Sequence, residues 1–215
     1  MSLMISVSGI RGVVGESLTP KNLTAFAMAF AALIVRQRER REGIQRVQRP
    51  KIVIGRDTRP TGKAISDLVS NTLLLCGCDV VDLGVATTPT VEIAVPGEHA
   101  DGGLIITASH NPVAWNALKM LNHQGEFLNA ADVDELLAIA DEELFVTAHW
   151  DSIGTLSVNE RYDALHSKKV LDLPALISPP SKKSSFGYLL TAWKGLAPPL
   201  SPNSAGNLAS RALSK

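Results

Sequence analysis

The sequence predicts an α/β fold: a three-layer α/β/α domain around a mixed, mostly parallel sheet, followed by an irregular tail. Short apolar runs alternate with segments of helical length over the first two-thirds of the chain, which is typical of βα units. A composition of 45% hydrophobic and 20% charged residues over 215 positions is that of a globular protein with an ample core. Beyond residue 172 the periodicity fades and every acidic residue disappears, which predicts the tail.

The predicted helices begin at recognisable capping residues. Thr19 followed by Pro20 marks a helix start, because threonine accepts backbone N–H bonds and proline suits the first helical position. The basic stretch 36–41 then falls in the last turns, where the macrodipole favours cations, so a solvated helix end explains it better than a nucleic-acid-binding patch. Further helices are predicted over 61–75, from Thr87 onward and over 130–142.

The predicted strands are short apolar runs between polar or glycine residues, at 51–55, 79–83, 103–106 and 116–121. Helices of this length between strands favour parallel neighbours, which is why we expect a largely parallel sheet. The chain contains no internal repeats.

Composition argues against several function classes. The 21 basic and 21 acidic residues cancel, so nothing supports binding to nucleic acid or to an anionic membrane. No apolar run is long enough to cross a membrane and the first residues lack a signal-peptide pattern, so we expect neither a nucleic-acid nor a membrane partner. Cys76 and Cys78 predict buried, inert thiols in a reducing cytoplasm, because no second Cys/His pair accompanies them to bind a metal.

A polar loop at 107–112 follows the apolar strand 103–106 and carries a single serine, Ser109. In α/β proteins such a loop at the carboxyl end of the sheet presents a reactive group. An esterase would need a Gly-x-Ser-x-Gly elbow, and Ala108 and His110 stand where its glycines would be. The loop therefore suits phosphate chemistry better than acyl chemistry.

With this loop, four ordered stretches resemble the α-D-phosphohexomutase family of phosphoglucomutases, phosphomannomutases and phosphoglucosamine mutases. They are Ser8–Gly12, Gly55–Arg59, Asp82–Gly84 with Thr87–Thr90, and Thr107–Pro112 followed by Trp115–Lys119. Two features depart from the family pattern: Ser-Val replaces the usual Phe-Gly-Thr before the first motif, and Trp115 and Ala117 replace a common Tyr and Gly.

The resemblance covers about residues 5–172 and implies three parts. Residues 1–148 correspond to the phosphoserine domain, 149–172 to a linker and a helix leading toward a second domain, and 173–215 to an aberrant, frameshifted or disordered tail. The family's metal-binding, sugar-reading and phosphate-gripping domains are then missing, so this truncated chain is expected to be inactive alone.

A shifted reading frame would explain the tail. Permissible codons for residues 187–197, read from the third base, yield Val-Phe-Val-Asp-Gly-Val-Glu-Gly-Ala-Gly, which resembles the start of the family's second domain. We therefore expect a frame slip near residues 183–186, and gene codons incompatible with that frame would exclude it.

The resemblance implies that Ser109 is carried as a phosphoserine. It passes its phosphoryl group to a hexose phosphate, and the hexose 1,6-bisphosphate returns its other phosphate, so that phosphate moves between C6 and C1. A Mg²⁺ ion would bind the phosphate on Ser109, with its remaining ligands in the missing second domain. Arg11 and Lys119 can neutralise phosphate charge, His110 can hydrogen-bond the phosphate or act as acid or base, and Asn111 shapes the loop or contacts phosphate.

Each of these roles has a structural alternative. Ser109 could cap the following turn, Lys119 could be a solvated edge residue, and Arg11 could be surface charge in a glycine-flanked loop. Asp57, between two arginines, is predicted to form a structural ion pair or a helix cap. At the level of the whole chain, a non-catalytic phosphosugar-binding module is the alternative function. A serine hydrolase fits poorly, because adjacent residues such as Ser109 and His110 seldom align as nucleophile and base.

Overall fold

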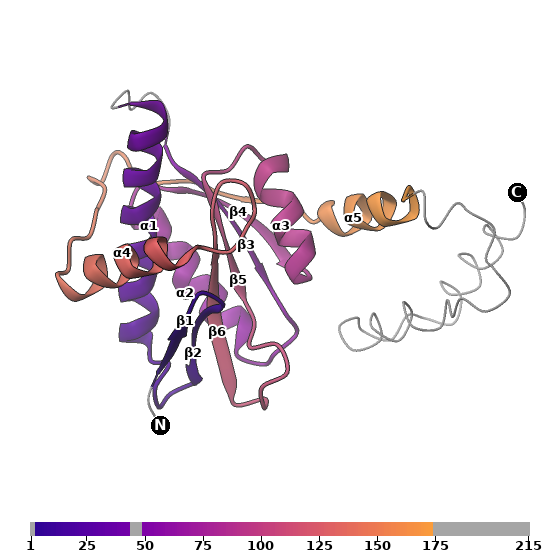
Figure 1. Ribbon diagram of the computed structural model, residues 1–215, viewed down its shortest axis with the longest axis horizontal. Helices are drawn as coiled ribbons and strands as arrows, with labels where there is room; N and C mark the ends of the chain where they lie inside the picture. The colour runs from indigo at the N-terminus through magenta and orange to yellow at the C-terminus, as the bar shows by residue number, and fades with distance from the viewer. Residues whose placement is uncertain (1–2, 44–48, 174–215) are drawn as a thin grey trace, which may run out of the picture. The chain divides into compact units, whose positions relative to one another are not determined.

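The computed structural model describes residues 3–43 and 49–173. Contacts divide the chain into a unit Met1–Val170 and a unit Leu171–Lys215, and the fold below is that of the first. The strands are β1 (Met4–Ser6), β2 (Gly9–Val13), β3 (Lys51–Arg56), β4 (Asp79–Val85), β5 (Gly102–Ile106), β6 (Trp115–Leu121) and β7 (Leu156–Val158). The helices are α1 (Pro20–Glu42), α2 (Gly62–Leu75), α3 (Thr88–Gly97), α4 (Ala130–Asp141) and α5 (Tyr162–Leu171) (Figure 1).

The seven strands form one mixed sheet in the order β1-β2-β6-β5-β3-β4-β7. Strands β5, β3, β4 and β7 pair in parallel, whereas β1, β2, β6 and β5 pair antiparallel. The predicted α/β fold with a mixed sheet is confirmed, although parallel pairing covers one half of the sheet instead of most of it. The reason is local: β5 connects to β6 through a short loop without a helix, and such a loop can only join antiparallel strands.

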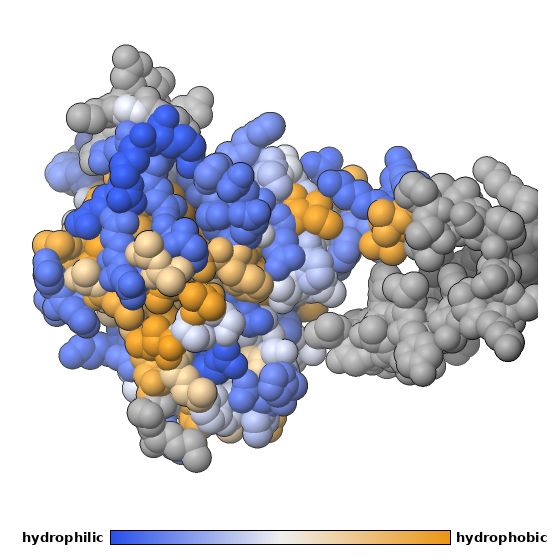
Figure 2. All heavy atoms as spheres, in the orientation of Figure 1, coloured by the Kyte–Doolittle hydropathy of each residue, from blue (hydrophilic) through white to orange (hydrophobic). Residues whose placement is uncertain are grey.

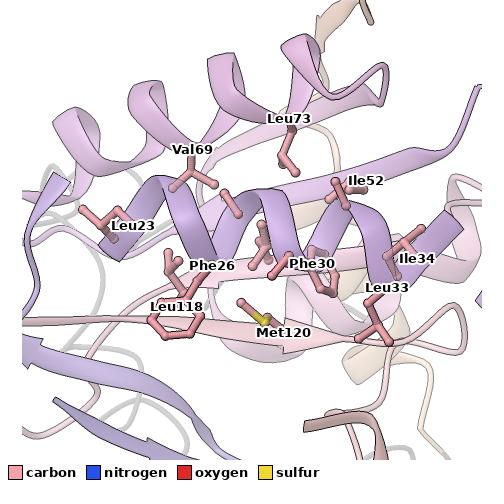
Figure 3. Close-up of a cluster of buried hydrophobic side chains, with 14 of the residues drawn as sticks. Leu23, Phe26, Phe30, Leu33, Ile34, Ile52, Val69, Leu73, Leu118 and Met120 are labelled. Carbon is pink, nitrogen blue, oxygen red and sulfur yellow. The ribbon is translucent and has the colours of Figure 1, made fainter. Parts of the chain in front are cut away.

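Helices α1, α2 and α4 cover one face of the sheet and enclose the larger core. Figure 3 shows α1 between two groups of apolar side chains: Val69 and Leu73 of α2 lie on one side, and Leu118 and Met120 of β6 lie on the other, where Phe30 of α1 points. Every residue of α1 from 29 to 34 is at most 1% exposed, so this helix is buried around its whole circumference. The sheet is therefore rigidly supported on this face.

The opposite face is covered less completely. Helix α3 packs on β3 and β5, and its Val91 and Val95 meet Val53, Ile105 and other apolar side chains there in a smaller core. Strand β6 contributes Leu121 to this core. Because side chains alternate along a strand, Lys119 of β6 lies on the same face of the sheet as Leu121.

Several helix starts follow the predicted caps. The hydroxyl of Thr19 accepts from the Asn22 N–H at 3.3 Å, and that of Thr87 accepts from the Thr90 N–H at 3.3 Å. Thr61 differs: it makes no capping bond, and its hydroxyl instead accepts from the amide of Asn116 at 3.0 Å.

The basic end of α1 is neutralised by two carboxylates. Glu135 pairs with Arg36 and Arg40, and Asp101 pairs with Arg38 and Arg41. Figure 2 shows this end of α1 as a hydrophilic surface. The arrangement fits the predicted solvated helix end.

Other expectations have different outcomes. Cys76 and Cys78 are buried and free, as predicted. Burial raises the pKa of the Cys76 thiol to about 11. Strands β1, β2 and β7 were not expected, and the glycine-flanked loop expected around Arg11 is instead strand β2. No helix in the described part of the chain is long and apolar enough to span a membrane. The predicted irregular tail and its frameshift lie outside the described residues, apart from Leu173.

Candidate functional site

The loop between β5 and β6 displays Ser109 to solvent. Thr107 and Ala108, directly after β5, are still buried, whereas Ser109 and His110 are exposed. Ser109 has φ +54°, the left-handed region that side chains other than glycine adopt only when their surroundings hold them there. Its N–H donates to the Thr107 hydroxyl at 3.1 Å. The chain thus turns sharply at the residue that carries the hydroxyl.

The guanidinium of Arg59, just before α2, is hydrogen-bonded to several backbone carbonyls of this loop. Its five N–H groups meet five oxygens: Nε donates to Asp57 Oδ2 (3.1 Å), Nη1 to the carbonyls of Pro112 (2.8 Å) and Trp115 (3.0 Å), and Nη2 to those of Ser109 and Asn111 (both 2.8 Å). An arginine has five donors in a fixed planar fork, so all of them are satisfied here.

Asp57 fixes the orientation of Arg59. Its Oδ1 accepts from the Arg59 backbone N–H at 3.0 Å while its Oδ2 takes the Nε donor, and the two side chains are 10% and 12% exposed. The predicted structural ion pair of Asp57 is therefore confirmed. Its backbone N–H in turn donates to the Ile106 carbonyl at 3.1 Å, which ties the end of β3 to the end of β5.

Arg11 and Lys119 lie on neighbouring strands, β2 and β6, on the face of the sheet that α3 covers in part. Arg11 on β2 is the register partner of Ala117 on β6, and Lys119 follows two residues later on the same side of the sheet. Burial, and next the neighbouring Arg11 charge, lower the pKa of Lys119, while the Glu92 and Asp57 carboxylates oppose the shift. Within the described residues neither cation has a carboxylate in ion-pair contact, so both can accept an anion.

The structural alternative for Lys119 is wrong. Lys119 is not a solvated edge residue: β6 is an interior strand between β2 and β5, and the half-buried ammonium lies 5.6 Å from the centre of the Phe127 ring. For Arg11 only the expected loop is wrong, because this residue lies on strand β2, where its Nη2 donates to the Ser8 hydroxyl.

The neighbours of Ser109 have distinct environments. The Ser109 hydroxyl lies 3.5 Å from His110 Nδ1, a long contact at the limit of hydrogen bonding. No backbone N–H in the described ranges donates to that hydroxyl, so the turn-capping alternative is wrong. Asn111 donates its N–H to the Ala108 carbonyl at 3.1 Å, and its Oδ1 is buried without a partner there.

Asn116 is a site-supporting residue that the sequence did not reveal. It is fully buried, its Nδ2 donates to Thr61, and its Oδ1 accepts from the Ala117 N–H at 2.9 Å. Arg59 was also missed as a loop support, although it lies within the Gly55–Arg59 motif. The signal available was the Arg-Asp-x-Arg cluster of charges, Arg56 to Arg59, at the end of a buried strand.

The structure thus brings the predicted residues together in two groups. Ser109, His110 and Asn111 share one loop, and Arg11 and Lys119 share one face of adjacent strands. A backbone hydrogen bond connects the two groups: the Thr107 N–H, at the start of the loop, donates to the Ala117 carbonyl of β6 at 3.2 Å. Ala117 is in turn the register partner of Arg11 on β2.

The described residues do not fit a metal ion by themselves. They contain no group of three or more His, Cys, Asp or Glu side chains that could hold one. Asp57 lies two residues before Arg59, and both of its carboxylate oxygens already accept hydrogen bonds from Arg59.

An exposed serine thus lies on a loop clamped by Arg59, in an α/β domain where the same loop is joined to the strands that carry Arg11 and Lys119. Residues 3–147 match the family described as phosphoglucomutase/phosphomannomutase, alpha/beta/alpha domain I. The chain belongs to this family and covers its first domain.

Similar proteins carry mutase names. A phosphoglucomutase/phosphomannomutase of Thermococcus kodakarensis is 40% identical over 159 residues, which cover 73% of this chain and 32% of that protein. A phosphoglucosamine/phosphogalactosamine mutase of Sulfurisphaera tokodaii is 31% identical over 155 residues, covering 72% and 31%. A crystal structure of a family member from Burkholderia thailandensis superposes with a TM-score of 0.63 at 26% identity, covering 79% of this chain and 37% of that one. The chain spans about a third of the length of the curated relatives it matches.

Proposed function

We propose that this chain is the phosphoryl-carrying domain of a phosphohexomutase, with Ser109 as the carrier. The observation that carries the proposal is the display of Ser109 at φ +54° on a loop joined to the strands that hold Arg11 and Lys119. A serine phosphate is stable in water, yet it can be transferred where cations neutralise its charge.

The proposed reaction is a pair of reversible transfers. The bond between Ser109 Oγ and phosphorus breaks as a hydroxyl oxygen of a hexose phosphate bonds to that phosphorus, and the sugar proton ends on Ser109 Oγ. The resulting hexose 1,6-bisphosphate then returns its other phosphoryl group to Ser109, so phosphate has moved between C6 and C1. Transfer of this kind depends mainly on positioning and on charge neutralisation.

The residues of the site take the corresponding roles. Arg11 offers a planar fork of donors to the phosphoryl oxygens, and Lys119 offers a point charge. Because the pKa of Lys119 is lowered, this ammonium also gives up a proton more readily than a solvated lysine. His110, with Nδ1 3.5 Å from Ser109 Oγ, can relay the proton or hydrogen-bond the phosphate.

The Mg²⁺ ion implied by the resemblance would bind the phosphate on Ser109 and take its other ligands from outside the described residues. Since the chain spans about a third of its relatives, we expect it to carry phosphate but to show at most trace isomerisation alone. The free, buried thiols support a reducing cytoplasm as its compartment.

The test is phosphorylation by a bisphosphate donor. The purified chain is incubated with glucose 1,6-bisphosphate and Mg²⁺, and intact-mass and peptide mass spectrometry locate any added phosphoryl group. We expect one group on Ser109, and none in Ser109→Ala. Binding of the donor by calorimetry without any mass change would contradict the carrier role and support the non-catalytic phosphosugar-binding module instead.

A further inference from the structure

Arg59 is bound to the reactive loop more extensively than any other side chain described in the site. Four carbonyls between residues 109 and 115 converge on its guanidinium, from positions 50 to 56 residues away in the chain. Otherwise the loop is held by turn bonds, such as Asn111 N–H to Ala108 and Trp115 N–H to Pro112, and by one backbone bond from the residue after β2, Val14 N–H to the Ala114 carbonyl at 2.9 Å. Arg59 therefore supplies most of the long-range hydrogen bonds to the loop in the described residues.

The charge of Arg59 is already committed. Asp57 is bonded to its Nε, and both side chains are nearly buried, at 12% and 10% exposure. With all five donors used, Arg59 has no N–H left for a phosphate oxygen. Arg11 and Lys119, by contrast, have no carboxylate partner among residues 3–43 and 49–173.

The conformation that the fork supports is an unfavourable one. Ser109 at φ +54° would relax toward ordinary backbone angles unless its surroundings held it. Arg59 binds the carbonyl of this very residue and that of Asn111, on the far side of the turn. Loss of the fork frees the hydroxyl to leave its displayed position.

We propose that Arg59 is a positioning residue for phosphoryl transfer: it contacts neither phosphate nor sugar and sets the place of the Ser109 hydroxyl by clamping the loop carbonyls. The effect of Arg59 on phosphoryl transfer rests on the proposed function. The clamping of loop 107–115 by Arg59 does not. A lysine cannot replace it, because an ammonium has three donors without a planar fork.

The experiment compares Arg59→Lys with Arg56→Lys, a matched change in the same motif. Within the described residues the Arg56 side chain makes one hydrogen bond, from Nη1 to the Asp57 carbonyl at 3.2 Å, and none to the loop. Transfer from glucose 1,6-bisphosphate to Ser109 is followed in single turnovers at increasing donor concentration. Hydrogen–deuterium exchange of peptides covering 107–115 is measured in parallel, without donor.

For Arg59→Lys we expect the rate at saturating donor to fall roughly 10- to 100-fold, with little change in the half-saturating concentration. Exchange in 107–115 should rise while the remaining peptides keep their protection, and Arg56→Lys should behave as the parent chain. Added guanidinium ion should restore part of the rate in Arg59→Ala, which a general loss of stability would not allow.

Two results would overturn the inference. One is a raised half-saturating concentration at unchanged maximal rate, which would make Arg59 a phosphate ligand. The other is unchanged exchange in 107–115 in Arg59→Lys. If the parent chain accepts no phosphate, the proposed function fails, while the exchange comparison still decides whether Arg59 clamps the loop.

Discussion

Replacing Asp57 by asparagine tests the ion pair that orients Arg59, the residue that binds the carbonyls of the Ser109 loop. The carboxylate accepts two bonds from Arg59, at 3.0 and 3.1 Å, in an environment where its side chain is 10% exposed. Asparagine can keep the bond to the backbone N–H through its oxygen, but its NH₂ group then faces Nε, another donor. One charge-assisted bond is lost, and the guanidinium keeps its charge without a carboxylate.

A bond to a charged group contributes about 1.5–3 kcal/mol, and removing one member of a fully buried pair costs about 3–5 kcal/mol. Arg59 retains four carbonyl acceptors, so we expect Asp57→Asn to lower the free energy of unfolding by about 2–3 kcal/mol. For a chain of this size that corresponds to a fall of roughly 4–12 °C in the melting temperature.

Urea unfolding followed by circular dichroism measures the change. Asp67→Asn is the matched control, because Asp67 pairs with Lys63 at a distance of 2.6 Å on the surface, where the two side chains are 53% and 65% exposed. An exposed pair of this kind contributes about 0.3–0.5 kcal/mol. Equal effects of the two substitutions would refute the claim that Asp57 stabilises Arg59 and the loop above it.

Three further predictions concern the strands beside the loop. Gly9→Ala should lower the free energy of unfolding in urea by about 2–4 kcal/mol, because Gly9 has φ +116° and a Cβ there would lie 2.6 Å from the Leu118 carbonyl oxygen. Gly15→Ala is the control: Gly15 has φ +87° but open space around it, so this change should cost only the backbone strain, about 1–3 kcal/mol. A larger loss of stability for Gly15→Ala than for Gly9→Ala would contradict the prediction. Lys119→Met should raise stability near neutral pH. The folded-state pKa of Lys119 lies below the ordinary 10.5, so the charged lysine destabilises the folded parent chain at lower pH, and this destabilisation disappears as the pH rises toward 10.5. The sign would be wrong if the parent chain became more stable than Lys119→Met as the pH falls. Arg11→Gln should raise the donor concentration for half-maximal labelling of Ser109 about tenfold, measured by mass spectrometry, since a charged fork is replaced by a neutral amide; an unchanged value would remove Arg11 from phosphate binding.

Local signals predicted most helices and the longer strands. The cap at Thr19 and the start at Thr87 involve residues within three positions of each other, so the sequence alone contains the interaction. The buried strand 103–106 and the polar loop after it were likewise recognisable as a run of apolar residues ending at Ser109. These elements depend on neighbours in the chain.

The short strands could not be predicted in this way. Strands β1 and β7 have three residues each, and all of those residues are exposed, so no apolar pattern marks them. They form because β2 and β4 offer them free edges to pair with. The interior position of Lys119 likewise follows from pairings between distant segments, because β6 lies between β2 and β5.

By itself, the sequence determined which residues could serve a phosphate: one serine on a loop after a buried strand, and two cations spaced along the chain. Only the tertiary structure decided how they are held. Arg59 reaches carbonyls more than 50 residues away, and Asn116 reaches Thr61 across the sheet. Backbone carbonyls have no residue type, so contacts to them leave no mark in a sequence and become visible only when the chain has folded.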